Sequence, residues 1–325
     1  MALDGLSITV LMPVFNDWIA VDLVLKELDR VCAGSSARPS VVLINDGSTE
    51  GNSSFLSWTP KSFAQVEVLD LCCNVGHQRA LCVGAVHAHQ EYPGTTLLIM
   101  DADGEDSPQD VPRLIKQFIA EKHQKAVFAE RGRRMETLTF KLFYQFYRAV
   151  HFLLVGFDIR IGNFSVLPPA LLNPLLHSPD LWNHYAATVM KLKLPMATVR
   201  IDRAKRVRGR SQMGFARLIV HGLSAMSVYG EVIGARILML ASALLCVGFL
   251  AFVAVIAIRL MTTLAIPGWA TTAAGLLLIL ILQVGTVALL FTLGVLGFRG
   301  MQVFIPIRDC PAFISTVRTL GRWGQ

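Results

Sequence analysis

Charged residues are scarce in this sequence of 325 residues: they make up 16%, against 53% hydrophobic residues, and the mean hydropathy is +0.52. The six cysteines show none of the spacings of a zinc site, which argues against a zinc-binding module. The N-terminus lacks a basic stretch followed by an apolar core, so we expect no cleaved signal peptide. The sequence also lacks internal repeats and low-complexity linkers. None of these features explains the large apolar fraction of the sequence.

Two long stretches contain no charged residue at all. Ile237–Ile258 is about 22 residues long, roughly the length that crosses the apolar core of a bilayer. Ala270–Phe298 is long enough to span a bilayer with some tilt. A buried core helix is the alternative for each stretch, but helices this long and this apolar are rarely of that kind. Pro267-Gly268 between them is typical of a turn. We therefore expect two transmembrane helices.

Basic residues lie on one side of these two spans. The segment Arg200–Arg217, upstream of the first span, contains a single acidic residue, Asp202, and seven basic ones: Arg200, Arg203, Lys205, Arg206, Arg208, Arg210 and Arg217. Four arginines follow the second span (Arg299, Arg308, Arg318 and Arg322), whereas the turn holds only Arg259. The positive-inside rule therefore predicts a multi-pass protein of the inner (plasma) membrane with both termini in the cytoplasm.

The residues before the basic segment alternate between strand-like and helix-like patterns. The expected strands are Ile8–Val14, Val41–Ile44, Val66–Leu71 and Thr96–Met100, and the expected helices are Asp17–Cys32, Gln78–His89 and Gln109–Glu121. This alternation predicts an α/β fold with a mostly parallel sheet and helices on both faces. We expect an α/β domain over residues 1–200, a basic juxtamembrane segment over 201–235, and a membrane domain with a cytoplasmic tail over 236–325.

Aspartates follow two of the predicted strands directly. Val41–Ser48 reads VVLINDGS and Leu97–Pro108 reads LLIMDADGEDSP. Buried parallel strands deliver such residues to the carboxyl edge of a sheet, where α/β proteins bind ligands. Asp101 and Asp103 are separated by one residue, so an extended backbone points both the same way. Two hard oxygen ligands suit Mg²⁺ or Mn²⁺, with water and diphosphate oxygens completing the shell.

These motifs, in this order, resemble family 2 glycosyltransferases of the GT-A fold. They resemble in particular the polyprenyl-phosphate glycosyltransferases, which include dolichol-phosphate mannose synthases and bactoprenol glucosyltransferases. The resemblance rests on these segments: MPVFND at 12–17, INDGS at 44–48, NVGHQRAL at 74–81, DADGEDSP at 101–108, RGRR at 131–134, IGNF at 161–164 and RVRGRS at 206–211. The two terminal spans add to it.

The resemblance assigns a donor site and a metal site. It implies that the nucleotide sugar is bound by Pro13, Phe15, Asp17, Asp46, Asn74, Gln78, Asp101 and Ala102. Asp101, Asp103 and Glu105 would be the metal ligands, with Glu105 standing where relatives often have a glutamine. The alternative is that residues 103–106 only cap the next helix, since Asp106 or Ser107 would make a good N-cap before Pro108.

An acceptor carrying a phosphate monoester fits the arginine-rich motifs. Its second pKa lies near ~6, so it arrives largely deprotonated and needs cations rather than a general base. The acceptor phosphate would be bound by Arg131, Arg133, Arg206 and Ser211, and the catalytic set would be Asp103, Arg131, Arg134, Asn163 and Arg206. The basic run would also attract anionic lipid, by about 1 kcal/mol per residue near the surface.

Two positions depart from the family pattern, both on the acceptor side. Asn163 stands where relatives commonly have an aspartate, and Gln212 follows Ser211 where relatives tend to have a lysine. An amide cannot act as a base, so either no base is needed or Asp158 replaces it.

We therefore expect a metal-dependent, inverting transferase that moves a sugar from a nucleotide diphosphate to a polyprenyl phosphate at the cytoplasmic face. A UDP-sugar is the favoured donor and GDP-mannose the second choice. The alternatives are a processive polysaccharide synthase, although Arg322-Trp323 lacks the expected preceding glutamine, and a non-catalytic scaffold that binds nucleotide sugars. We expect no nucleic-acid partner, and a homo-oligomer stays open.

Overall fold

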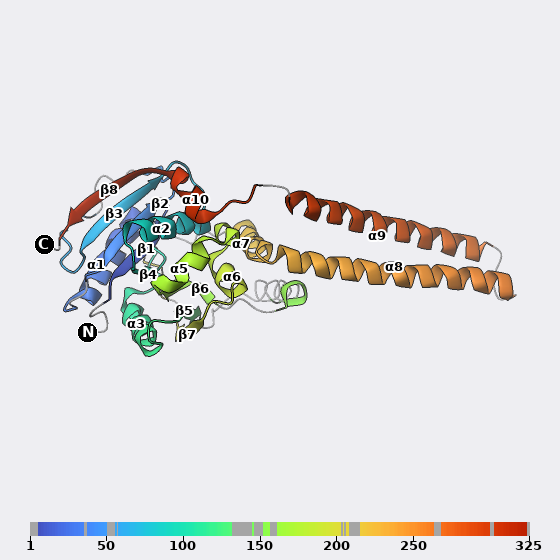
Figure 1. Ribbon diagram of the computed structural model, residues 1–325, viewed down its shortest axis with the longest axis horizontal. Coiled ribbons are helices and arrows are strands. Elements are labelled where there is room, and N and C mark those ends of the chain that lie inside the picture. The colour runs from blue at the N-terminus through green and yellow to red at the C-terminus, as the bar shows by residue number, and fades with distance from the viewer. Residues whose placement is uncertain are drawn as a thin grey trace. The chain divides into compact units, whose positions relative to one another are not determined.

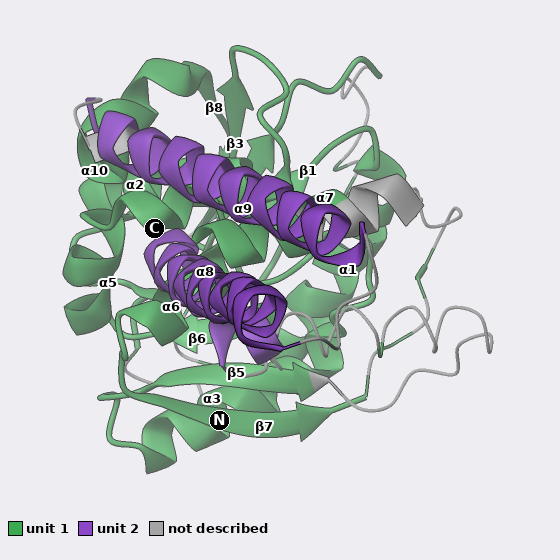
Figure 2. Cartoon of the chain, turned by 90° about the vertical axis from the view of Figure 1, so that its right-hand side faces the viewer, with its two compact units in different colours: residues 1–145, 158–228, 304–325 green, residues 146–157, 229–303 purple. Residues whose placement is uncertain are grey.

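The computed structural model describes residues 6–35, 38–50, 56, 58–131, 145, 152–156, 161–202, 204, 206–207, 215–262, 268–299 and 302–323. The chain divides into two compact units (Figure 2). The first consists of Met1–Gln145, Asp158–Val228 and Phe304–Gln325, and the second of Phe146–Phe157 and Tyr229–Val303. Each is described separately below.

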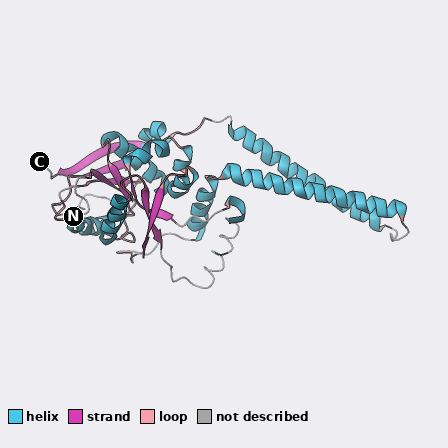
Figure 3. Ribbon diagram, turned by 60° about the horizontal axis from the view of Figure 1, so that its bottom comes forward, coloured by secondary structure: helices cyan, strands magenta, loops and turns pink. Residues whose placement is uncertain are grey.

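The first unit is built on one eight-stranded sheet with the order β7-β5-β6-β4-β1-β2-β3-β8 (Figures 1 and 3). The strands are β1 (Ile8–Val14), β2 (Ser40–Asn45), β3 (Gln65–Leu71), β4 (Thr96–Ile99), β5 (Ala126–Arg131), β6 (Ile161–Leu167), β7 (Met196–Ile201) and β8 (Ile314–Arg322). The pairs β1–β2, β1–β4, β2–β3 and β5–β7 are parallel. The pairs of β6 with β4 and β5, and of β8 with β3, are antiparallel. This sheet confirms the predicted mostly parallel α/β fold.

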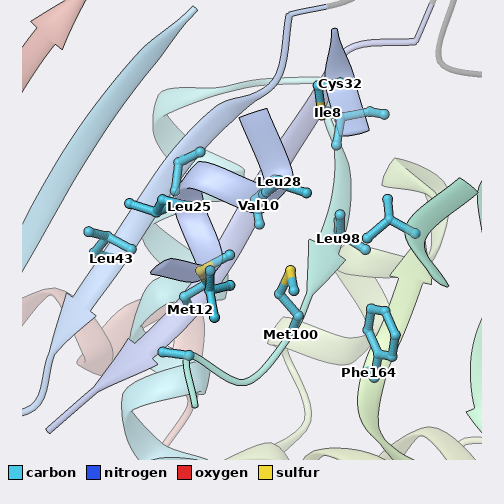
Figure 4. Close-up of a cluster of buried hydrophobic side chains, with 14 of the residues drawn as sticks. Ile8, Val10, Met12, Leu25, Leu28, Cys32, Leu43, Leu98, Met100 and Phe164 are labelled. Carbon is cyan, nitrogen blue, oxygen red and sulfur yellow. The ribbon is translucent and has the colours of Figure 1, made fainter. Parts of the chain in front are cut away.

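Helices cover both faces of this sheet. The helices of this unit are α1 (Trp18–Cys32), α2 (His77–Glu91), η1 (Pro108–Asp110), α3 (Val111–Ala120), α5 (Pro169–Leu176), η2 (Pro179–Trp182), α6 (Tyr185–Lys191), α7 (Phe215–Ser227), α10 (Pro306–Asp309) and η3 (Cys310–Phe313), of which α1 and α3 lie on one face and α2 on the other. Every residue of β1 is buried, and its side chains alternate between two hydrophobic clusters. Val10 and Met12 join the cluster under α1 and α3 (Figure 4). Leu11 joins the cluster under α2.

The C-terminal segment differs from the expectation of a cytoplasmic tail attached to the membrane domain. Ile314–Arg322 pairs with β3 along its length and forms the last strand of the sheet. Cys310, just before this strand, is fully buried and lies 3.6 Å from the sulfur of Cys82 in α2. The chain therefore returns to the α/β domain after the second apolar stretch and completes its sheet.

The second unit is dominated by two long apolar helices, α8 (Gly230–Met261) and α9 (Trp269–Arg299). Each contains one of the predicted spans, and both are long and apolar enough to cross a membrane. They pack on each other where α8 has small residues: a Cβ added at Gly248 would lie 3.2 Å from Ile281 of α9. Their other large apolar side chains are mostly exposed, which suits a lipid environment better than water.

Candidate functional site

The loops that follow β1, β2 and β4 meet at one edge of the sheet. Because β1 lies between β2 and β4 and runs parallel to both, the carboxyl ends of all three strands point the same way. These loops carry the FND, NDGS and DADGED motifs. The sheet therefore brings together the aspartates that the sequence singles out.

Asn16 fastens the first two loops together. Its backbone has a φ of +54°, a conformation that asparagine tolerates better than most residues. Its side-chain oxygen accepts hydrogen bonds from the backbone N–H groups of Thr49 (2.8 Å) and Glu50 (3.0 Å). Its own N–H donates to the hydroxyl of Ser48 (3.0 Å). The loop after β2 is thus fixed against the loop after β1.

Asp46 joins the loop after β2 to the start of α2. Its two carboxylate oxygens accept hydrogen bonds from the backbone N–H groups of Val75 (2.7 Å) and Gly76 (3.0 Å). The side chain is buried, and this burial raises the pKa of Asp46 more than the two hydrogen bonds lower it. Gly47 follows with φ +67°, and a Cβ there would lie 2.7 Å from the backbone nitrogen of Asn74. Only glycine allows the two loops to approach this closely.

The segment after β4 folds into a tight turn around its own carboxylates. The N–H of Asp101 donates to Asp106 (2.9 Å), and the N–H of Glu105 donates to Oδ1 of Asp103 (2.9 Å). Helix capping falls to Ser107, whose hydroxyl accepts from the N–H of Gln109 (3.3 Å). Of the residues considered above as helix caps, Ser107 is therefore the one that caps this helix. The side chains of Asp101 and Asp103 are engaged elsewhere.

Arg206 pairs with Asp103. Its Nη2 and Nε lie 2.8 and 3.2 Å from Oδ2 of Asp103. Burial lowers the pKa of Arg206, but the hydrogen bond and the charge of Asp103 outweigh that effect and raise it. Two backbone hydrogen bonds hold the same segment to the turn, from Val207 to Asp103 (3.2 Å) and from Ala204 to Glu105 (3.1 Å). Arg206, which is predicted to bind phosphate, therefore forms an ion pair with Asp103, a predicted metal ligand.

His77, the first residue of α2, is a member of the site that the sequence analysis did not select. Its Nε2 lies 3.3 Å from Oδ1 of Asp101 and 2.8 Å from Nδ2 of Asn163. The side chain of His77 is 41% exposed, and the charges of Asp101, Asp106 and Asp103 raise its pKa; Nε2 can accept from Asn163 only in the neutral form of the ring. The residue falls inside the NVGHQRAL motif, which was the available signal.

Asn163 of β6 is nearly buried, and its amide is held from both sides. Its side-chain oxygen accepts from Gln78 (3.1 Å), and Gln78 in turn accepts from the backbone N–H of Tyr185 (2.8 Å). Since a backbone N–H can only donate, this bond sets the orientation of the Gln78 amide and then of the Asn163 amide. The Asn163 NH₂ group therefore points to His77. Asn163 and Gln78, both predicted site residues, belong to one network.

The other predicted residues are distributed as follows. Phe15 is exposed in the loop after β1, whereas Pro13 and Ala102 are buried. Arg131 is the last residue of β5. Arg133, Arg134, Asp158 and Ser211 lie outside the described residues. In the part of the chain that the structure describes, no three His, Cys, Asp or Glu side chains already converge as in a preformed metal centre.

Comparison with known proteins agrees with the family resemblance of the sequence motifs. The model of the family "Glycosyl transferase family 2" matches residues 9–170. YkcC of Bacillus subtilis (strain 168), an uncharacterized glycosyltransferase, is 22% identical over 94% of this chain and 92% of its own length. An undecaprenyl-phosphate 4-deoxy-4-formamido-L-arabinose transferase of Klebsiella pneumoniae (strain 342) is 26% identical over 34% of this chain and 33% of its own length.

A solved structure shares the fold. It is the glucosyl-3-phosphoglycerate synthase of Mycobacterium tuberculosis, in complex with Mn²⁺, UDP-glucose and phosphoglyceric acid. The match covers 71% of this chain and 80% of the other, with a TM-score of 0.51 and 14% sequence identity. At this identity the likeness concerns the fold alone. Together with the motifs at the sheet edge, these matches place the chain in glycosyl transferase family 2, with a catalytic domain of the GT-A fold.

Proposed function

We propose that the protein transfers a sugar from a nucleotide diphosphate to a polyprenyl phosphate, with inversion and with a divalent metal, at the cytoplasmic face of a membrane. The observation that carries this proposal is the cluster of carboxylates at the sheet edge. Asp46 follows β2, and Asp101 and Asp103 follow β4; these two strands flank β1, and helix capping uses a different residue, Ser107. UDP-sugar is the favoured donor and GDP-mannose the second choice.

The carboxylates of the proposed metal site fit a hard divalent cation such as Mg²⁺ or Mn²⁺. Asp101, Asp103 and Glu105 would hold it, because carboxylate oxygens are the ligands these ions prefer. Bound there, the metal would neutralise charge on the leaving diphosphate. The Mn²⁺ and UDP-glucose of the mycobacterial enzyme with this fold support the proposal. Arg206, 2.8 Å from Asp103, would add a second positive charge beside the diphosphate.

The acceptor side favours a phosphate nucleophile. Asn163 has an amide, which cannot take up a proton near neutral pH, and this amide is already bonded to Gln78 and His77. A phosphate monoester is largely deprotonated at pH 7 and can attack the anomeric carbon directly. A single displacement of this kind inverts the configuration. The name of the Klebsiella relative, an undecaprenyl-phosphate transferase, supports such an acceptor.

The direct test is an incubation of the purified full chain with undecaprenyl phosphate, Mn²⁺ and a panel of UDP- and GDP-sugars. Mass spectrometry should find a lipid carrying one sugar with one of these donors, and chelation of the metal should remove the product. Hydrolysis of the nucleotide sugar without formation of a glycosylated lipid would refute the proposal that a polyprenyl phosphate is the acceptor. Binding of nucleotide sugars with neither product would favour the non-catalytic scaffold.

We predict that no protein group acts as the base toward the acceptor. The rate at saturating donor should rise through about pH 6 and then level off, following the second ionisation of the phosphate. An acceptor phosphonate ionises at higher pH, so it should move this rise upward. Asn163→Ala should mainly raise the apparent KM for the lipid. If the rise stays in place with the phosphonate, or if Asp158→Asn alone abolishes transfer in folded protein, a protein base is required.

We also predict that the catalytic domain faces the cytoplasm. The helices α8 and α9 lie between β7 and β8 in the chain, and both strands belong to one sheet, so the pair of helices must begin and end on the same side of a membrane. The arginine asymmetry makes that side cytoplasmic. In a variant lacking native cysteines, Thr262→Cys should react with an impermeant thiol reagent on intact cells, and Thr319→Cys should react only after permeabilisation. The reverse pattern would overturn the orientation.

A further inference from the structure

The strand that follows the two long apolar helices contacts the end of β3 through a bidentate ion pair. Arg318 of β8 donates from Nε (2.6 Å) and Nη2 (2.9 Å) to the two carboxylate oxygens of Asp70. Thr316 of the same strand donates to Asp70 as well (3.0 Å). Burial raises the pKa of Asp70, but these donors together lower it, so the carboxylate is ionised at neutral pH. Paired forks of this kind fix geometry better than single contacts.

Asp70 passes this geometry on to β2. Asn45 donates its NH₂ group to Oδ1 of Asp70 (2.7 Å). An ionised carboxylate can only accept, so the side-chain oxygen of Asn45 must point the other way. That oxygen accepts the backbone N–H of Ser48 (3.1 Å). Ser48 in turn accepts the N–H of Asn16 through its hydroxyl (3.0 Å). The contacts form a continuous path from the C-terminal strand to the NDGS loop and the FND loop.

We infer that Arg318 is a positioning residue for the donor: by orienting Asp70 and Asn45, it holds the loop of Asp46–Glu50 in the conformation that receives the nucleotide. This inference rests on the proposed function for the identity of the ligand. On this inference, the C-terminal strand β8 has a functional role in addition to completing the sheet. The segment that follows the apolar helices would fix the loop on which donor binding depends, although Arg318 itself does not touch the donor site.

The ion pair also joins β8 to β3, but its contribution to stability should be small. The side chain of Arg318 is 42% exposed and that of Asp70 18%, so the pair lies near the surface, where ion pairs typically contribute about 0–1 kcal/mol to stability, with bidentate pairs toward the upper end. Removing one should therefore leave folding largely intact. The effect of its loss should appear in the loop.

The first experiment compares Arg318→Gln with Arg322→Gln in the full-length protein. Arg322 is an exposed arginine on the same strand, paired with Gln65 at the opposite end of β3, so both variants lose one positive charge from β8. Hydrogen exchange should become faster at the amides of Ser48, Thr49 and Glu50 in Arg318→Gln and stay unchanged in Arg322→Gln. Equal protection of these amides in both variants and in wild type would overturn the inference. This readout needs no ligand.

The second experiment measures the donor. With the nucleotide sugar that supports transfer, Arg318→Gln should raise KM about tenfold with kcat nearly unchanged, and Arg318→Lys should recover part of the loss. Asn45→Ala should have a similar effect, and adding Arg318→Gln to it should change KM little further, because both act along one path. Fully additive effects would contradict the path. If wild type binds no nucleotide at all, the proposed function fails, and hydrogen exchange still decides the inference.

Discussion

Asp103→Asn should reduce sugar transfer at least about a hundredfold, which corresponds to about 2.7 kcal/mol of transition-state stabilisation. Asn has one oxygen and no charge, so it is a poor ligand for a hard divalent cation and a poor partner for Arg206. It can still accept the N–H of Glu105, which Asp103 now accepts at 2.9 Å. The turn should therefore keep its shape, and the loss should appear in activity and in Mn²⁺ affinity rather than in folding.

Asp110→Asn is the matched control for this variant. Asp110 lies in the same stretch of chain, at the end of η1, and pairs with Arg113 (2.8 Å) at the surface. The substitution removes the same charge without touching the turn, so transfer should stay close to wild type. If Asp103→Asn keeps more than about a tenth of the wild-type rate, a penalty under ~1.4 kcal/mol, the assignment of Asp103 as a metal ligand is wrong.

Local sequence patterns predicted the carboxylate edge because the signal there is short-range. A buried strand that ends in aspartate places that residue at the carboxyl end, whatever the rest of the fold does. Asp46, Asp101 and Asp103 follow this rule, and the structure places all three at one edge of the sheet. Their roles toward nucleotide and metal stay predictions.

The residues that the sequence analysis missed depend on long-range contacts. His77 lies inside the NVGHQRAL motif, but its partner Asp101 follows a different strand, and the two meet only because α2 begins against the loop after β4. The strand β8 was overlooked for a related reason. Most of its side chains are exposed, so it lacks the apolar alternation of a half-buried strand, and its partner β3 lies more than two hundred positions earlier in the chain.

Arg206 shows a third kind of limit. Its basic neighbourhood predicted contact with phosphate or lipid, and the structure places it on Asp103 instead. Both observations are compatible with one site, because an arginine beside the carboxylates would also face a diphosphate bound to them through a metal. Sequence alone identifies the charge but leaves its partner undefined.

Asp46→Asn should weaken nucleotide binding about thirtyfold, or about 2 kcal/mol, which is typical of losing a charged hydrogen-bond acceptor. Asp46 accepts one backbone N–H on each oxygen, from Val75 and Gly76. The NH₂ group of an asparagine would face one of these donors and push the two loops apart. Isothermal titration with UDP and GDP measures the change directly and does not depend on the acceptor.

Stability should respond differently from binding. Because burial raises the pKa of Asp46, its ionised form costs folding free energy at neutral pH, and this cost appears as pH rises through the raised pKa. Asp46→Asn removes that cost while losing one hydrogen bond, so the free energy of unfolding should change by no more than about 1 kcal/mol. The control is Asp29→Asn, another buried carboxylate, which accepts the N–H groups of Lys61 (3.0 Å) and Ser62 (2.7 Å) away from the site.

The pH dependence separates this account from simple misfolding. As the pH is lowered, wild-type Asp46 should take up its proton at a higher pH than an ordinary aspartate and lose one acceptor oxygen. Nucleotide affinity should therefore begin to fall at a pH above the usual range of aspartate pKa values. Asp46→Asn already lacks that oxygen and should not show this step. Asp29→Asn should bind nucleotide as wild type does, at every pH where it is folded. If Asp46→Asn binds UDP or GDP as tightly as wild type, the loop after β2 does not hold the nucleotide.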